Sequence, residues 1–106
     1  MLTVVETPTF QRTWSDYWSE DERGQFASYL ALTPDAGDVV PGAGGVRKIR
    51  WTRPGAGKRG GVRVVYFNRL ADGEVWLLLI YSKSVRDNVS AKLLKLLKQE
   101  VSDAHD

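Results

Sequence analysis

Basic side chains are concentrated in one stretch of the 106-residue chain, KIRWTRPGAGKRGGVRVVYF at 48–67. The stretch holds six Lys or Arg residues and no acid. Lys48 and Arg50 are two residues apart, so on a strand both side chains point to the same face. Arg63 joins them if the next strand places it opposite Arg50, whereas a shift of one residue turns it to the other face. The sequence leaves this register open.

Clustered cations can bind a phosphodiester backbone, and they can also act on RNA. RNA carries its own nucleophile, the 2′-OH, so an enzyme has to align it, remove its proton and stabilise the charged transition state. One well-aimed donor contributes roughly 3 to 4 kcal/mol to that stabilisation, and a lysine among cations has its pKa lowered toward that of a general base. Lys58 and Arg59, in the glycine-rich loop, could close over a ligand, and Lys83 follows a strand. The alternative for all these residues is a solvated basic surface.

Charge is distributed unevenly along the chain. Residues 39–71 contain 8 Lys or Arg and no acid, whereas residues 1–38 contain 2 Lys or Arg against 7 Asp or Glu. Residues 72–106 are nearly balanced, with 5 against 6. A dense positive block on an otherwise acidic chain predicts a polyanionic partner.

Several classes of site lack the residues they need. The chain has no cysteine, and its single histidine, His105, is next to the last residue. A thiolate or histidine metal site and a Ser–His–Asp triad are therefore not expected. The glycine-rich segments 42–45 and 55–61 lack the Ser or Thr and the strand–helix context of a phosphate-binding Walker loop. We expect neither a metal nor a cofactor.

Hydrophobic patterns predict one α+β domain over 1–106, in the order β-α-α-β-β-β-α. An N-terminal helical hairpin and a C-terminal helix should cover one face of an antiparallel sheet, with 102–106 frayed. Strand 75–82 is apolar on both faces and should be fully covered. The expected elements are strands at 2–5, 46–53, 62–68 and 75–82, and helices at 7–18, 19–33 and 90–106.

Capping signals support the three predicted helices. Thr7 precedes Pro8, which fits a first helical turn, and Ser19 with Glu22 forms a capping box. Ser90 can cap the last helix. The aromatic residues at helical spacing in the first helix should face the core rather than stack on bases; they are Phe10, Trp14, Tyr17 and Trp18.

No apolar run is long enough to span a bilayer, and the N-terminus lacks the pattern of a signal peptide. We therefore expect a cytoplasmic protein with no membrane partner.

Four sequence segments, GGVRKIRW, GKRGGVRVVYF, LLLIYSKS and RDNVS, together with the element order, resemble the RelE/HigB toxins of bacterial type II toxin–antitoxin systems. The resemblance runs from about Val5 to Val101 and is nearest to the HigB-like branch of the RelE superfamily. It implies a microbial-RNase-like fold and an endoribonuclease (mRNA interferase) that cuts mRNA on the ribosome by 2′-OH attack, which inhibits translation. By position, it assigns catalytic roles to Lys48, Arg50, Arg63 and Lys83. We further expect RNA contacts from Arg53, Lys58, Arg59 and Tyr81.

The chain departs from this pattern at two positions. The arginine that RelE proteins have just beyond the basic residue after the last strand is Ser84 here, and the tyrosine or histidine near the final helix is Ser90. The general acid and base therefore remain open among Tyr81, Lys83 and Lys48, or positioning alone activates the 2′-OH.

The resemblance also implies partners, namely the ribosome, mRNA and a cognate antitoxin of the helix-turn-helix, HigA-like type. DNA would be contacted only through that antitoxin, since no recognition helix is visible in this chain. The alternative function is a non-catalytic RNA- or ribosome-binding protein of the same fold. A DNA-associated regulatory subunit acting through the antitoxin is a third possibility.

Overall fold

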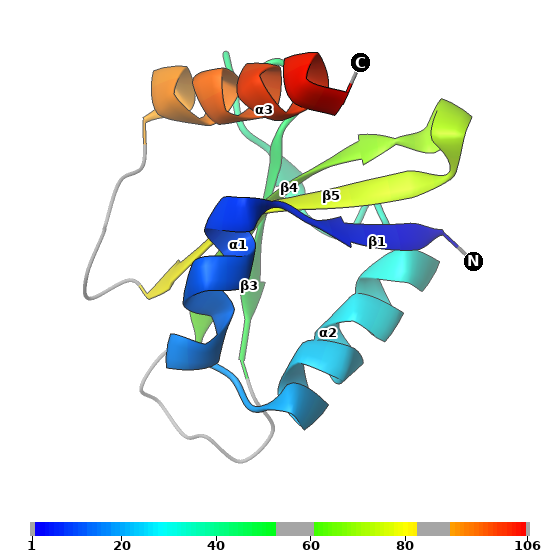
Figure 1. The fold of residues 1–106 in the computed structure, drawn as a ribbon, viewed down its shortest axis with the longest axis vertical. Coiled ribbons are helices and arrows are strands. Elements are labelled where there is room, and N and C mark those ends of the chain that lie inside the picture. The colour runs from blue at the N-terminus through cyan, green and yellow to red at the C-terminus, as the bar shows by residue number, and fades with distance from the viewer. Residues whose placement is uncertain (1, 53–60, 83–89, 106) are drawn as a thin grey trace.

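The computed structural model describes residues 2–52, 61–82 and 90–105, and side chains up to Gln99. The described chain forms one five-stranded sheet in the order β1-β5-β4-β3-β2, with helices on both sides (Figure 1). The elements are β1 Thr3–Glu6, α1 Pro8–Thr13, η1 Trp14–Asp16, α2 Glu20–Leu32, β2 Asp38–Val39, β3 Arg47–Trp51, β4 Val62–Arg69, η2 Leu70–Asp72, β5 Glu74–Ser82 and α3 Ala91–His105. The α+β class and the predicted element order are confirmed, with the addition of the short strand β2.

The sheet is mixed rather than wholly antiparallel. β2, β3, β4 and β5 pair antiparallel, but β1 lies parallel to β5, with Thr3 beside Glu74 and Glu6 beside Leu77. The helical segment between β1 and β2 carries the chain away from this edge. As a result β1 pairs with β5, the last strand in the sequence, and not with β2, the next one. All residues of β5 except its first and last are buried, as predicted for a covered strand.

The expectation that all helices lie on one face of the sheet is wrong. One core packs α1 and α2 against the sheet through Phe10, Phe26 and Leu30. A second core, on the opposite face, packs α3 through Leu94. In Figure 1 α3 lies on one side of the sheet, with α1 and α2 on the other. β4 and β5 carry apolar side chains on both faces, and helices cover both faces of these strands.

The helix starts agree with the capping signals. The Thr7 hydroxyl accepts a hydrogen bond from the Phe10 N–H, and Ser19 and Glu22 form the reciprocal capping box. The first helix is shorter than predicted, because α1 ends at Thr13 and a 3-10 turn follows. Its aromatic residues nevertheless belong to the core: Phe10 and Trp18 are buried, and Trp14 and Tyr17 pack against them.

Tyr66 ties the α2–β2 connection to the sheet. This fully buried side chain accepts a hydrogen bond from the Gly37 N–H at 2.8 Å and donates one to the Pro34 carbonyl at 2.9 Å. The Arg47 guanidinium donates to the Gly37 carbonyl at 2.6 Å. These bonds fix the segment from which β2 begins.

No helix in the described part of the chain is both long and apolar enough to cross a membrane.

Candidate functional site

Three polar side chains form a row across three neighbouring strands. Arg50 on β3 lies opposite Arg63 on β4, and Arg63 lies opposite Tyr81 on β5. Directly opposed residues of antiparallel strands project from the same face, with Cβ atoms about 5 Å apart. The register that the sequence left open is thus the one that unites Arg50 and Arg63. We call these three residues the cationic row.

Lys48 extends the cationic row along β3. It is exposed, as is Arg50, and alternation places both on the same face. α3 covers a different part of this face, through Leu94 and the side chains of β4 and β5 around it. The end of the sheet that holds the cationic row therefore presents Lys48 and Arg50 to solvent.

Asp38 is a neighbour of this site that the sequence did not suggest. It lies opposite Lys48 in the β2–β3 pairing and is exposed. Its carboxylate is therefore placed on the same face as the cations. β2 is only two residues long, so it carries no alternating pattern from which the sequence could have predicted a strand.

Arg63 is more enclosed than Arg50. It is half-buried, and its Nη1 atom is buried with no hydrogen-bond partner among the residues that the structure describes. Buried polar groups normally have partners, so this donor is available to an acceptor that enters the site. A phosphate oxygen is such an acceptor.

Tyr81 closes the cationic row on the β5 side. Only 4% of its surface is exposed. Burial raises the pKa of Tyr81, and the nearby charge of Arg63 partly opposes that shift. The phenol is therefore protonated at neutral pH and can donate a hydrogen bond, whereas little of its ring is open to stacking.

Four of the eight predicted site residues lie in the described chain, and all four belong to this one region: Lys48, Arg50, Arg63 and Tyr81. The other four, Arg53, Lys58, Arg59 and Lys83, lie outside the described residues. Ser90 caps α3, since its hydroxyl accepts a hydrogen bond from the Leu93 N–H at 3.1 Å. That position therefore has a structural role in this chain.

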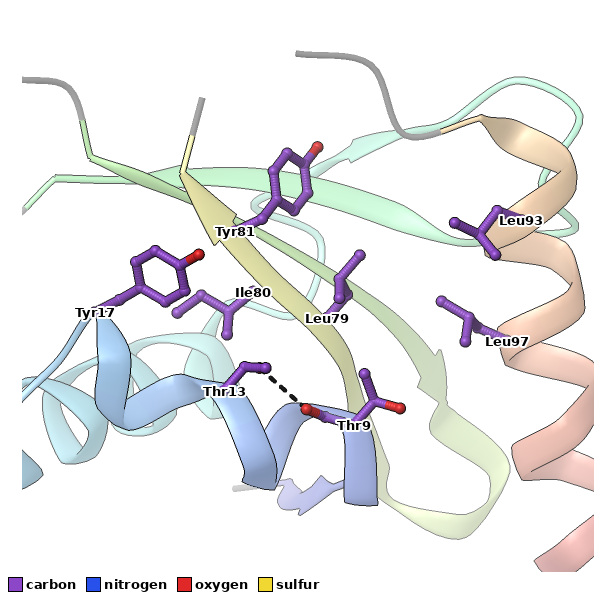
Figure 2. A pocket seen from close by; sticks show the side chains of 8 residues that line it. All are labelled: Thr9, Thr13, Tyr17, Leu79, Ile80, Tyr81, Leu93 and Leu97. Atoms are coloured by element: carbon purple, nitrogen blue, oxygen red, sulfur yellow. Dashed lines mark hydrogen bonds between the residues drawn. The ribbon is translucent and has the colours of Figure 1, made fainter. Parts of the chain in front are cut away.

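A groove lies next to Tyr81 at the edge of β5 (Figure 2). It has a volume of about 350 Å³. It runs between the α1–η1 segment and α3, and its lining residues are Thr9, Thr13, Tyr17, Leu79, Ile80, Tyr81, Leu93 and Leu97.

No family model matches this sequence. Among solved structures, the chain is similar to the Escherichia coli toxin RelE, determined in the free state as a double arginine-to-alanine mutant. The TM-score is 0.63 at 12% identity, over 92% of this chain and 96% of that chain. It is also similar to a chain of the intact E. coli RelBE toxin–antitoxin complex, with a TM-score of 0.59 at 14% identity, over 77% and 96% of the two chains. The protein therefore has a RelE-like fold, in agreement with the predicted fold class.

Proposed function

We propose that this protein is the toxin of a type II toxin–antitoxin pair, of the HigB-like branch, and that it cleaves mRNA on the ribosome without a metal ion. The observation that carries the proposal is the cationic row beside Lys48, at an end of the sheet that α3 leaves open. Function does not follow from a fold alone, so the argument depends on this set of side chains and its chemistry.

In the proposed reaction the 2′-OH of one nucleotide attacks the adjacent phosphorus. A cyclic 2′,3′-phosphate forms, the bond to the 5′-oxygen breaks, and that oxygen leaves with a proton. Charge develops on the non-bridging phosphate oxygens, where Lys48, Arg50 and Nη1 of Arg63, which has no partner in the described part of the chain, would stabilise it.

Proton transfer needs a donor and an acceptor besides these cations. Tyr81 keeps its proton at neutral pH, because a tyrosine phenol has a pKa of about 10 and burial raises that of Tyr81 further. It therefore suits hydrogen-bond or proton donation and not the role of base. Lys48 and Lys83 remain the candidates for the base, as does activation of the 2′-OH by position alone. Arg53, Lys58 and Arg59 are proposed to contact the RNA backbone.

The proposed setting is the bacterial cytoplasm, where mRNA and ribosomes are found. The proposed neutralising partner is a helix-turn-helix antitoxin of the HigA-like type, through which alone DNA would be contacted. The similarity to a chain of the RelBE toxin–antitoxin complex supports the proposal that this protein binds an antitoxin.

A non-catalytic RNA- or ribosome-binding protein is the second candidate. The observation in its favour is Ser90, which caps α3 where the resemblance leads one to expect a tyrosine or histidine. Such a protein binds RNA with an affinity that falls with salt, at a slope of roughly −0.7 per phosphate contacted, and yields no cut product.

Expression of the chain in a bacterial host, followed by primer extension on cellular mRNA, tests the proposal. We expect growth arrest and cleavage within translated codons. The double variant Lys48→Ala/Arg63→Ala should abolish both effects. The matched control Arg12→Ala/Lys95→Ala removes the same amount of charge from exposed positions on α1 and α3, and it should remain toxic.

Three results would decide against parts of the proposal. Growth arrest without new mRNA ends favours the non-catalytic binder. Full toxicity of Lys48→Ala/Arg63→Ala would show that the site is assigned wrongly. The metal requirement can be tested with the purified chain and ribosomes. If EDTA abolished cleavage, and a divalent ion that the ribosome does not itself need restored it, the reaction would not be metal-independent.

A further inference from the structure

An acid stands beside the cations of the candidate site. Asp38 lies opposite Lys48, and Arg50 follows two residues further along β3 on the same face. β2, β3 and β4, all within the described chain, hold no other Asp or Glu. The Asp38 carboxylate is exposed, and it has neither a hydrogen bond nor an ion pair with any residue that the structure describes. A ligand that reaches Lys48 therefore also meets an uncommitted acid.

The backbone that carries Asp38 is held in place through Gly37. The Gly37 N–H donates to the Tyr66 hydroxyl at 2.8 Å, and its carbonyl accepts from the Arg47 guanidinium at 2.6 Å. A Cβ at Gly37 would lie 3.0 Å from the Lys48 carbonyl oxygen and 2.8 Å from the Tyr66 hydroxyl, so this close packing requires glycine. The fold therefore fixes the Asp38 backbone relative to that of Lys48.

A carboxylate selects among the groups of an RNA strand. It accepts hydrogen bonds and donates none, so it repels phosphates and binds donors. Apart from the 2′-OH, which every nucleotide has, the donors of single-stranded RNA are N–H groups on the base edges, where proteins read them. Guanine offers two adjacent donors, N1–H and the N2 amino group, which match the two oxygens of a carboxylate. Uracil offers one N–H between two carbonyl oxygens, and adenine and cytosine offer one amino group beside a ring nitrogen that accepts.

We propose that Asp38 gives the RNA site a preference for guanine, by accepting two hydrogen bonds from an unpaired guanine whose phosphate lies on Lys48 and Arg50. The inference rests on the proposed function, because it adds a base contact to phosphate contacts that are themselves proposed. Opposed side chains on neighbouring strands have Cβ atoms about 5 Å apart, so one nucleotide can reach both Lys48 and Asp38. Bidentate hydrogen bonds to a charged group are strong and directional, and a site that binds an N–H group rejects a ligand that lacks it.

Two other roles are available to this carboxylate, and each predicts a different result. As a source of repulsion alone, Asp38 weakens the binding of every RNA by the same factor. As an ion-pair partner that orients Lys48, it strengthens phosphate binding, again without regard to the base. Only a direct contact with the base makes the effect of Asp38 depend on the sequence of the RNA.

Short RNAs that differ in one functional group test the proposal. Three oligouridylates carry guanosine, inosine or uridine at one central position, and inosine is guanosine without its N2 amino group. Sugars with a 2′-O-methyl group lack the nucleophile, so the ligands are not cut and binding is measured apart from cleavage. In fluorescence anisotropy the full chain should bind the guanosine RNA at least about fivefold more tightly than the inosine RNA, which is the lower end for a bidentate contact between a side chain and a base.

Asp38→Ala and Asp35→Ala form a matched pair of variants. Both remove one carboxylate from an exposed position close to Gly37, so both should fold. Only Asp38 belongs to the β2–β3 pair. We expect Asp35→Ala to keep the preference for guanosine over inosine, and Asp38→Ala to bind the two RNAs with nearly equal affinity.

The same variants can be compared in cells, which covers the case in which binding needs the ribosome. Mapped mRNA ends from cells that express the unmodified chain should be enriched in guanine next to the cut. Asp38→Ala should still cut but lose this enrichment, and Asp35→Ala should keep it.

Equal affinity of the unmodified chain for the guanosine and inosine RNAs would overturn the inference and leave the proposed function intact, as would cuts without a preference for guanine. A preference that Asp38→Ala retains, or that Asp35→Ala loses to the same extent, would overturn it as well. Absence of both RNA binding and mRNA cleavage would contradict the proposed function, and the inference would fall with it.

Discussion

Arg50 on β3 and Arg63 on β4 lie directly opposite each other in the antiparallel register. Like charges in this arrangement destabilise a sheet, by an amount within the range of roughly 0.2 to 1 kcal/mol found for cross-strand pairs. A neutral residue at either position would remove this repulsion. Anions that bind between the two guanidinium groups would relieve the repulsion, as the proposed RNA site requires.

Arg50→Gln should therefore raise the free energy of unfolding by a few tenths of a kcal/mol, within the same range of roughly 0.2 to 1 kcal/mol. Urea denaturation at low ionic strength measures this. The gain should shrink in about 0.5 M salt, because exposed charges are then screened. RNA binding should weaken in the same variant. Arg12→Gln, on α1, is the control and should show no such gain; a loss of stability in Arg50→Gln would contradict the repulsion argument.

Asp38 places a carboxylate beside Lys48 on the face of the proposed RNA site. Asp38→Asn should tighten binding of a guanine-free single-stranded RNA oligonucleotide by about two- to fivefold at low salt, since one repulsive charge near a phosphate is removed. Fluorescence anisotropy measures the affinity. Asp16→Asn makes the same change in the exposed η1 turn and should leave the affinity unaltered. Weaker binding after Asp38→Asn would instead give this carboxylate a positive role in the site.

The pKa of Tyr81 is raised by burial, which links this residue to stability at alkaline pH. The folded state holds the phenolic proton more tightly than the unfolded state does, so the resulting stabilisation is complete below about pH 10. It is lost as the pH rises from there through the pKa of the folded state. Tyr81→Phe should therefore show a smaller fall in unfolding free energy between pH 9 and pH 11, measured by urea denaturation. An equal fall in unfolding free energy in the variant and in the unmodified chain would contradict the raised pKa of Tyr81. The pH dependence that remains in the variant includes that of Tyr66, whose pKa burial also raises.

The hydroxyl of Tyr66 holds the segment that leads into β2. Tyr66→Phe leaves the buried Gly37 N–H without its acceptor, and we expect a loss of about 1 to 3 kcal/mol in unfolding free energy. Tyr29→Phe removes a hydroxyl from a side chain that is 41% exposed and should cost less than about 0.5 kcal/mol. Chemical denaturation of both variants provides the comparison. If the two costs were equal, the hydrogen bonds of Tyr66 would not be what fixes this segment.

Local signals in the sequence determined the helix starts and most of the strands. The hydroxyl of Thr7 and the Ser19–Glu22 pair act within one helical turn, so their effect is visible in a few consecutive residues. The alternation in 47–51 likewise placed Lys48 and Arg50 on one face. The side chains of the candidate site that belong to one strand could thus be grouped from the sequence.

Only the tertiary structure decided which side chains share a face of the sheet with Arg63 and lie beside it. A strand's period of two fixes its own faces but not its register with a neighbour, so the opposition of Arg50 and Arg63 depends on the pairing of β3 with β4. The parallel placement of β1 and the position of α3 depend on contacts between residues far apart in the chain, Leu94 with the sheet among them. The groove beside Tyr81 follows from both, because β1 stops at Glu6 and α3 forms one of its walls.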